Sequence, residues 1–213
     1  MIGINTRTYP SKNLGMESVK TNNPEPTYIS ATNVVSEELA KKLIELVDER
    51  GKRSEWSYNP VCMEYQIANP FSKIRAPTDD KVVDVLPDLF GLGESFLRHI
   101  NWNFNNNVCD IATGHHGFWI LKYDEGGEFE SHCDWDSGPN GIRPPIVATA
   151  GVLLNEGFRG GEMVLFDSKG NPTIIDQQRA SAVVWDGFTQ HRVATVTEGV
   201  RYALVIHYTG TIK

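Results

Sequence analysis

Cysteine is scarce in this sequence. Only three cysteines occur in 213 residues, Cys62, Cys109 and Cys133, and no two of them form a C-x-x-C pair. Thiols so few and so scattered exclude a disulfide framework. They indicate a reduced, cytoplasmic setting.

Long apolar runs and an excess of positive charge are also missing. No stretch approaches the ~18 apolar residues of a membrane-spanning helix, and residues 1–15 lack the hydrophobic segment of a secretory signal. The formal net charge is −7, whereas binding to a phosphate backbone depends on clustered Lys and Arg. We therefore expect neither a membrane nor a nucleic-acid partner.

The first half of the chain predicts helices. Residues 1–27 are rich in turn-forming residues and show no period, so we expect an irregular lead-in. Apolar residues at helical spacing predict a helix between Ser36, which suits the N-cap, and Gly51, which ends it. A second helical region is expected over about residues 79–99, interrupted near the FGLG segment at 90–93. Together these elements form a helical support region over residues 28–106.

The second half predicts short strands. From about residue 107, β-branched and aromatic runs are separated by Gly, Asn and Asp at the spacing of all-β sandwiches and barrels. Two helices followed by seven or eight strands predict a mainly β fold with flanking helices. We expect a double-stranded β-helix (jelly roll, cupin-like) core over residues 107–213, with the helices packed on one face. Residues 1–213 are then a single domain.

Three residues in this half are candidate metal ligands. The segment 123–136 reads YDEGGEFESHCDWD and places His132 and Asp134 two positions apart. In a strand these two side chains point to the same face, and Cys133 between them points away. His191 begins another predicted strand and is the candidate for the third ligand. Two imidazoles and one carboxylate form the facial set of non-haem Fe(II) oxygenases, which leaves coordination positions open for a co-substrate and O₂.

A candidate carboxylate-binding group follows the third ligand. Arg201 lies ten residues after His191, which is enough for one strand, a turn and entry into the next strand. A guanidinium there can bind a carboxylate through two hydrogen bonds, and it fits the distal end of a dicarboxylate that chelates the metal. The hydroxyls of Tyr123 and Thr149 can complete this contact.

These elements resemble, in order and spacing, the catalytic domain of the prolyl 4-hydroxylase-like 2-oxoglutarate/Fe(II) dioxygenases. The resemblance extends over about residues 123–208: the Tyr and glycine pair, H-x-D, a T-x-x-x-L-N-type strand, a second Gly pair, a Trp-bearing strand, and the distal His and basic residue. The family's collagen-type members usually carry Lys where this chain has Arg201, whereas its oxygen-sensing members carry Arg. The Pro often found after the distal His is replaced here by Ala194 and Thr195.

The resemblance implies an enzyme that hydroxylates an unactivated C–H bond while 2-oxoglutarate is decarboxylated to succinate. It implies Fe(II) on His132, Asp134 and His191, 2-oxoglutarate held by Arg201 with Tyr123 and Thr149, O₂, and ascorbate as a reductant. The expected substrate is a prolyl residue in a peptide or protein.

Other functions stay open from the sequence. The same chemistry could act on a free amino acid or another small metabolite, and a non-catalytic cupin-like metal-binding module could share the ligands. Substrate recognition is expected in the loops 55–77 and 136–145. Trp135 suits either the core or a substrate wall, and His207 is expected to pack in the core or beside the site. The oligomeric state has no readable signal.

Overall fold

The computed structural model describes residues 16–17, 28–53, 63–68, 80–104, 109–135 and 145–212. The chain order of the elements in these residues is β1 (Met16–Glu17), β2 (Tyr28–Ala31), α1 (Glu37–Arg50), β3 (Lys52–Arg53), β4 (Met63–Ala68), α2 (Asp80–Phe104), β5 (Cys109–Tyr123), β6 (Phe129–His132), β7 (Ile146–Leu153), β8 (Arg159–Gly160), β9 (Met163–Phe166), β10 (Pro172–Ile175), β11 (Ala182–Asp186), β12 (His191–Val193), β13 (Val196–Glu198) and β14 (Arg201–Ile212).

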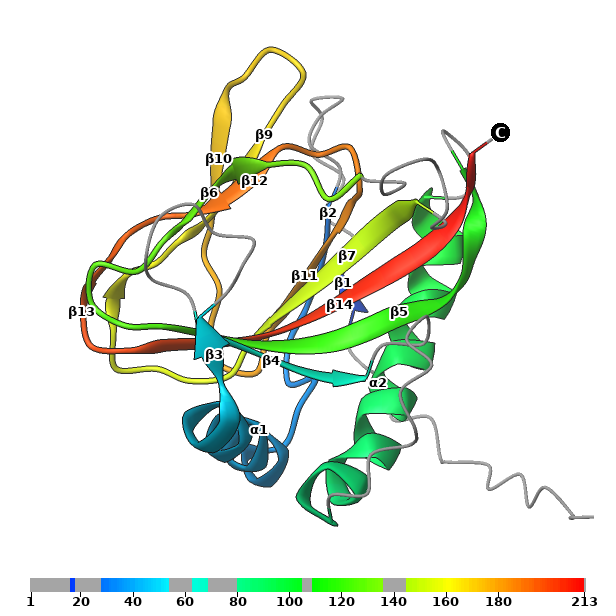
Figure 1. Cartoon of the computed structure of the whole chain (residues 1–213). Coiled ribbons are helices and arrows are strands. Elements are labelled where there is room, and N and C mark those ends of the chain that lie inside the picture. Colours follow the sequence, from blue (N-terminus) through cyan, green and yellow to red (C-terminus); the bar gives the residue numbers. More distant parts are fainter. Residues whose placement is uncertain are drawn as a thin grey trace, which may run out of the picture.

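Two antiparallel sheets build the core of the molecule (Figure 1). The large sheet has the strand order β1-β2-β11-β7-β14-β5-β4-β3, and the small sheet has the order β10-β9-β12-β6. Strands β8 and β13 form a separate pair. Sequence neighbours such as β5 and β6 lie in different sheets, as in a jelly roll, and this confirms the predicted fold class.

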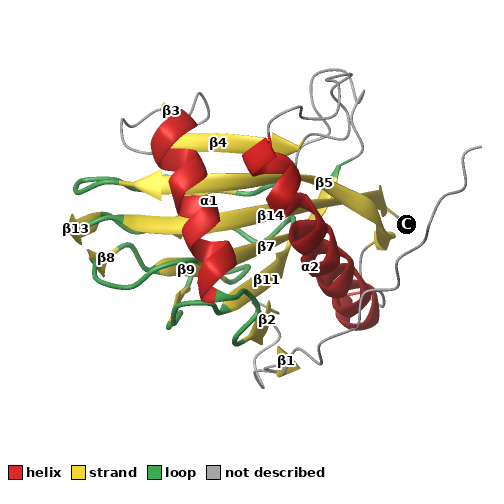
Figure 2. Cartoon of the chain, turned by 90° about the horizontal axis from the view of Figure 1, so that it is seen from below, coloured by secondary structure: helices red, strands yellow, loops and turns green. Residues whose placement is uncertain are grey.

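Both helices cover one face of the large sheet (Figure 2). Helix α1 begins where predicted, because the side chain of Ser36 accepts a 3.1 Å hydrogen bond from the backbone N–H of Leu39. Its buried stripe includes Leu43 and Val47, the spacing of one helix face. Neither helix in the described residues combines the length and apolarity needed to cross a bilayer.

Helix α2 corrects the prediction of an interrupted helix. It runs without a break from Asp80 to Phe104, through Pro87 and the FGLG segment. Leu89, Leu92 and Phe96 are buried in it at spacings of three and four residues. Because this apolar stripe continues in phase across the glycines, packing against the sheet outweighs their weak helix propensity.

The support region also differs from the prediction. Strands β2, β3 and β4 lie within residues 28–106 and extend the large sheet at both edges, so this region is not purely helical. The predicted lead-in 1–27 lies outside the described residues except for β1, which pairs with β2. Strand β2 pairs with β11 and β4 pairs with β5, both distant in sequence, which a local pattern does not reveal.

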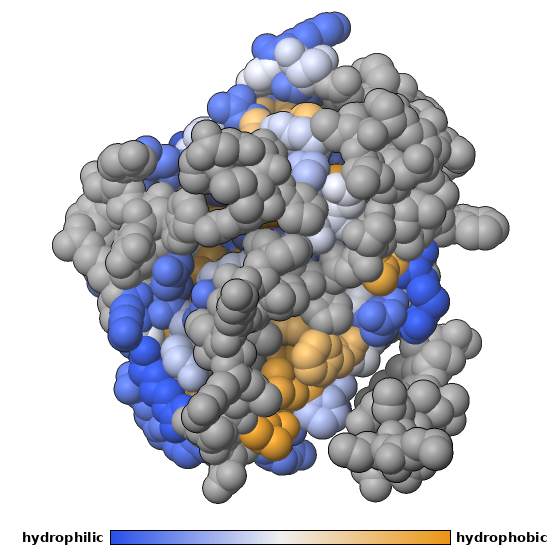
Figure 3. Space-filling view, turned by 45° about the vertical axis from the view of Figure 1, so that its right-hand side comes forward, coloured by the Kyte–Doolittle hydropathy of each residue, from blue (hydrophilic) through white to orange (hydrophobic). Residues whose placement is uncertain are grey.

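The large sheet separates two apolar layers. Its helix-facing side packs against α1 and α2 through residues such as Phe118, Ile120, Leu204 and Ile206. Its other side faces the small sheet, where Leu165, Val183 and Trp185 are buried. The candidate site lies in this second layer. On the face shown in Figure 3, apolar groups gather low in the view, beside polar ones.

Candidate active site

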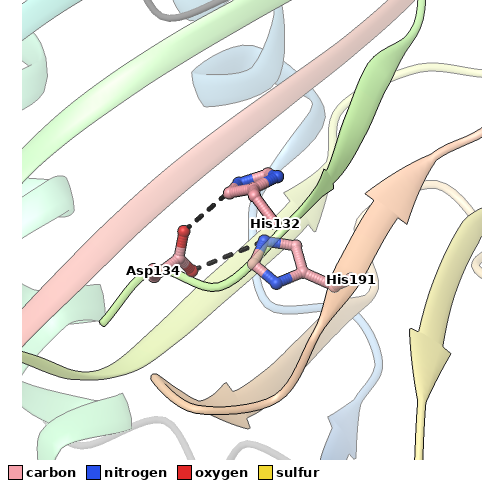
Figure 4. A group of neighbouring side chains, drawn as sticks. All are labelled: His132, Asp134 and His191. Carbon is pink, nitrogen blue, oxygen red and sulfur yellow. Dashed lines mark ion pairs between the residues drawn. The ribbon is translucent and has the colours of Figure 1, made fainter. Parts of the chain in front are cut away.

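The three predicted metal ligands converge in the structure (Figure 4). His132 ends β6 and His191 begins β12, and the two residues are direct cross-strand partners in the small sheet. Nε2 of His132 lies 3.4 Å from Oδ1 of Asp134, and Nε2 of His191 lies 3.5 Å from Oδ2. One donor atom from each residue lies within 4.8 Å of the other two, so a single ion can contact all three.

The position of Asp134 arises differently from the prediction. Strand β6 ends at His132, so Asp134 does not continue a regular strand. The backbone is held instead by the N–H of Trp135, which donates to the carbonyl of Gly187 at 2.8 Å. Cys133 is exposed, and its thiol donates to the carbonyl of Phe188 at 3.2 Å. The thiol is therefore turned away from the cluster, as predicted.

Backbone carbonyls orient both imidazoles. Nδ1 of His132 lies 2.7 Å from the carbonyl oxygen of Glu130, and Nδ1 of His191 lies 3.0 Å from that of Thr189. A carbonyl oxygen only accepts hydrogen bonds, so Nδ1 carries the proton in each ring. The Nε2 lone pairs then face Asp134, the arrangement that metal-binding histidines use.

The electrostatics keep the cluster ready for a cation. Burial raises the pKa of Asp134, but the neighbouring imidazoles of His191 and His132 and the hydroxyl of Thr149 outweigh burial, so the pKa of Asp134 lies far below its usual range. Burial lowers the pKa of His191 despite the nearby carboxylate. At His132 the contacts with Asp134 outweigh burial and raise the pKa.

Thr149 lies on the large sheet directly against this cluster. Its side chain is fully buried on β7, and its hydroxyl donates a 2.5 Å hydrogen bond to Oδ2 of Asp134. The sequence assigned this hydroxyl to the co-substrate, and the structure shows it engaged with the carboxylate. A contact between Thr149 and 2-oxoglutarate stays a prediction.

Arg201 and Tyr123 lie together in the same inter-sheet layer. They are direct partners in the pairing of β14 with β5, and the Arg201 guanidinium lies 5.2 Å from the centre of the Tyr123 ring. Both residues are almost fully buried, at 4% and 1% exposed. A buried cation beside a buried phenol can bind a carboxylate from two sides.

Glycine leaves room for this arginine. Gly161 has a φ of +68°, and a Cβ at this position would lie 2.8 Å from Cδ of Arg201 and 3.1 Å from Cγ2 of Val196. Gly161 therefore provides space for the aliphatic part of the Arg201 side chain.

Sequence reasoning missed two further contacts of the site. Trp185 on β11 places its ring 4.8 Å from that of His191. His207 is the direct cross-strand partner of Thr149, and its ring lies 4.8 Å from that of Trp119. Both contacts depend on strand register, for which the sequence carries no direct signal.

The predicted substrate segments are only partly described. Trp135 is half-buried and stacks on Phe188, with ring centres 4.3 Å apart and planes 19° apart. Residues 55–62, 69–77 and 136–144 lie outside the described part of the chain, so those segments stay a prediction.

The donor set fits a ferrous ion with a chelating co-substrate. Two neutral Nε2 atoms and one carboxylate supply three ligands and leave further positions open. In the same layer, the indole N–H of Trp185 is buried and has no hydrogen-bond partner in the part of the chain that the structure describes. Such a donor suits a space that receives a polar group.

Comparisons with known proteins agree with this geometry. Residues 118–209 match the 2OG-Fe(II) oxygenase superfamily. A PKHD-type hydroxylase of Idiomarina loihiensis is 34% identical over 86 residues, which are 40% of this chain and 38% of that protein. The chain thus spans less than half of that relative's length. A PKHD-type hydroxylase of Pseudomonas putida is 24% identical over 74% of this chain and 69% of its own length.

Solved structures share the fold. A Pseudomonas putida prolyl-4-hydroxylase superposes with a TM-score of 0.61 at 14% identity, over 86% of this chain and 92% of that one. A Trichoplax adhaerens prolyl hydroxylase, in complex with a hypoxia inducible factor peptide fragment, gives 0.64 at 16% identity, over 86% and 83%. The residues that match this superfamily, 118–209, include the three candidate metal ligands and Arg201. The solved neighbours show that the chain shares their fold.

Proposed function

We propose that this protein is an Fe(II)- and 2-oxoglutarate-dependent dioxygenase that hydroxylates a prolyl residue in a peptide or protein. The observation that carries the proposal is one shared layer: the His132, Asp134 and His191 donors and the Arg201–Tyr123 pair all lie between the two sheets. A metal cluster alone fits many functions. A metal cluster with a buried carboxylate-binding pair fits a dicarboxylate co-substrate.

The protein residues have defined tasks in this proposal. His132, Asp134 and His191 hold the iron through Nε2, a carboxylate oxygen and Nε2. Iron and 2-oxoglutarate, when bound with O₂, supply the oxidising chemistry that converts a C–H bond to C–OH and yields succinate and CO₂. Thr149 fixes the carboxylate of Asp134 through its 2.5 Å hydrogen bond, so that the ligand keeps its position.

Arg201 and Tyr123 orient the co-substrate. The guanidinium binds the carboxylate that lies away from the metal, and the phenol donates a hydrogen bond to the same group. Apolar side chains around them, among them Leu165 and Val196, are fully buried and exclude water from the pocket. No side chain is needed as a general base.

The choice of a prolyl substrate is supported by likeness. The Trichoplax neighbour is a prolyl hydroxylase with a bound peptide, and the Pseudomonas neighbour is a prolyl-4-hydroxylase. Ascorbate as the reductant and a cytoplasmic setting are part of this proposal. The same chemistry on a free amino acid or small metabolite is the alternative. A non-catalytic cupin-like module leaves the buried Arg201–Tyr123 pair without a purpose.

Two measurements test the proposal. Under anaerobic conditions, Fe(II) and 2-oxoglutarate together should give a weak visible charge-transfer band that neither gives alone. With O₂ and ascorbate, proline-containing peptides should yield succinate and a product heavier by one oxygen atom. If succinate never exceeds the enzyme-free blank with any peptide, amino acid or metabolite supplied, the protein is a binding module.

A further inference from the structure

A fourth histidine lies inside the site without belonging to the donor set. His207 lies on β14, where residues alternate between the two faces of the large sheet. Its neighbours Ile206 and Tyr208 face the helices, since both are fully buried in the helix-side core and the Tyr208 hydroxyl donates to the carbonyl of Gly93 in α2 at 3.1 Å. His207 therefore faces the small sheet. Its ring lies 4.8 Å from the ring of Trp119.

Strand register places this imidazole beside the metal ligands. His207 pairs directly with Thr149, and the hydroxyl of Thr149 donates to Asp134. Direct cross-strand neighbours have their Cβ atoms about 5 Å apart, so the imidazole is one side chain away from the Asp134 carboxylate. The charge of Asp134 acts on His207, yet burial dominates and lowers the pKa of His207. A neutral imidazole has one donor and one acceptor nitrogen.

His207 and Arg201 lie far apart along β14, on the side that faces the small sheet. The two residues face the same layer on one strand and are six positions apart, which is about 20 Å at the usual rise of a strand. The metal cluster is near the His207 end, because Thr149 contacts Asp134 there. 2-Oxoglutarate held by Arg201 and the iron occupies the space between them. The space on the His207 side of the metal is then left for the substrate.

His207 is less buried than its neighbours on the strand. It is half-buried, whereas Ile206 and Tyr208, which face the helices, are fully buried. Within the described ranges neither ring nitrogen of His207 makes a hydrogen bond to another residue. An enclosed imidazole without such a bond is stabilised when a ligand supplies one.

We propose that His207 is a substrate-binding residue that donates a hydrogen bond to a carbonyl oxygen of the substrate. This inference rests on the proposed function and narrows it to substrates with such an oxygen. A peptide bond supplies it as an amide carbonyl, and a free amino acid supplies it as a carboxylate. The aromatic face of Trp119 supports the imidazole from the side.

Chemical labelling tests this placement without any turnover. Diethyl pyrocarbonate modifies neutral, accessible imidazoles, and mass spectrometry locates the label. In the anaerobic protein with Fe(II) and 2-oxoglutarate, His132 and His191 should be protected by the metal and His207 should react. A capped proline-containing peptide should slow the labelling of His207 at least fivefold if the carbonyl is that of a peptide. Protection by free L-proline alone would identify the carboxylate.

Variants provide a second readout. H207Q keeps a hydrogen-bonding group and H207F keeps only the ring shape. The charge-transfer band and the 2-oxoglutarate Kd should stay within twofold of wild type in both variants. The kcat/KM for the protecting substrate should fall at least tenfold in H207F and stay within about threefold in H207Q.

The outcomes separate the two proposals. The assignment of His207 is overturned if His207 does not react, or if neither the peptide nor L-proline slows its labelling. It is also overturned if kcat/KM falls equally in H207F and H207Q. Absence of the charge-transfer band in the wild-type protein overturns the proposed function instead. Labelling of His207 by diethyl pyrocarbonate can also be measured in the metal-free protein. The assignment of His207 is therefore tested even if the charge-transfer band does not form.

Discussion

The Thr149 hydroxyl donates a 2.5 Å hydrogen bond to Oδ2 of Asp134, which joins the large sheet to the candidate metal centre. Asp134 lies just beyond the end of β6, where no strand pairing of its own fixes the side chain. The buried hydroxyl supplies that constraint. Thr149 thus orients a ligand, whatever further contact it makes with the co-substrate.

T149V should weaken metal binding about tenfold, because loss of a hydrogen bond to a carboxylate costs about 1.4 kcal/mol here. Valine keeps the shape of threonine and removes the hydroxyl. T149S keeps the hydroxyl and should bind the metal within twofold of wild type. Titration with Co(II), followed by its visible absorption, measures both constants. Equal affinities in T149V and T149S would show that the hydrogen bond does not orient the ligand.

Metal binding should stabilise the folded protein. At a metal concentration 100 times the Kd, linkage adds about 2.7 kcal/mol, which raises the Tm by about 5–10 °C in a chain of this size. H132A and D134A should lose this increase and all turnover while keeping a cooperative melt. Thermal melts with and without Mn(II) measure the effect. Retained turnover in either variant would contradict the ligand assignment.

The fold class and the convergence of His132, Asp134 and His191 were predictable because both leave local signals. Alternating and β-branched runs mark the strands, and H-x-D followed by a distal histidine marks ligands that face one space. The three side chains converge as predicted, but a regular strand is not what places Asp134. Strand β6 stops at His132, and a backbone hydrogen bond from Trp135 to Gly187 fixes the position instead. That bond joins segments about fifty residues apart, and no local pattern reports it.

In helix α2, local sequence signals predicted a break that the structure does not show. Glycine at 91 and 93 and Pro87 are local signals of a break, but burial of Leu89 and Phe96 against the sheet holds one continuous helix. Packing of the buried helix face against the sheet outweighs the low intrinsic helix propensity of glycine and proline here. His207 was likewise placed only near the site from sequence, because its pairing with Thr149 depends on the register of two strands that are fifty residues apart.

R201A should raise the Kd for 2-oxoglutarate about 30- to 100-fold, since a charge-assisted bidentate contact of about 2–3 kcal/mol is lost. R201K keeps the positive charge but loses the planar guanidinium that makes two hydrogen bonds to the carboxylate. It should raise the Kd for 2-oxoglutarate about tenfold. Anaerobic titration of the charge-transfer band measures the Kd, and Co(II) affinity should not change. An unchanged Kd in R201A would remove Arg201 from the co-substrate site.

The outer face of the same strands is anchored to α1. The carboxylate of Asp48 accepts hydrogen bonds from Lys122 at 2.7 Å and from the Tyr202 hydroxyl at 2.9 Å. These two residues are the sequence neighbours of Tyr123 and Arg201. D48A should lower the free energy of unfolding by about 1 kcal/mol and the Tm by about 2–4 °C. E45A is the control, because its pair with Lys41 is exposed and 4.0 Å long, and should leave the Tm unchanged.

Gly161 should prove necessary for co-substrate binding because of its contact with Arg201. An alanine there meets two penalties, a φ of +68° and a Cβ only 2.8 Å from Cδ of Arg201. The steric contact with the added methyl group displaces the aliphatic part of the Arg201 side chain. G161A should therefore raise the Kd for 2-oxoglutarate about tenfold, as R201K does, while Co(II) affinity stays within twofold of wild type.

Gly170 separates the two penalties. It has a φ of +82°, and a Cβ there meets no atom within 4 Å, so G170A carries the backbone strain without the contact. Both variants should lose about 1 kcal/mol of stability, but only G161A should weaken 2-oxoglutarate binding. Equal Kd values in G161A and G170A would show that Arg201 adjusts to the added methyl group, and the glycine would then serve the turn alone.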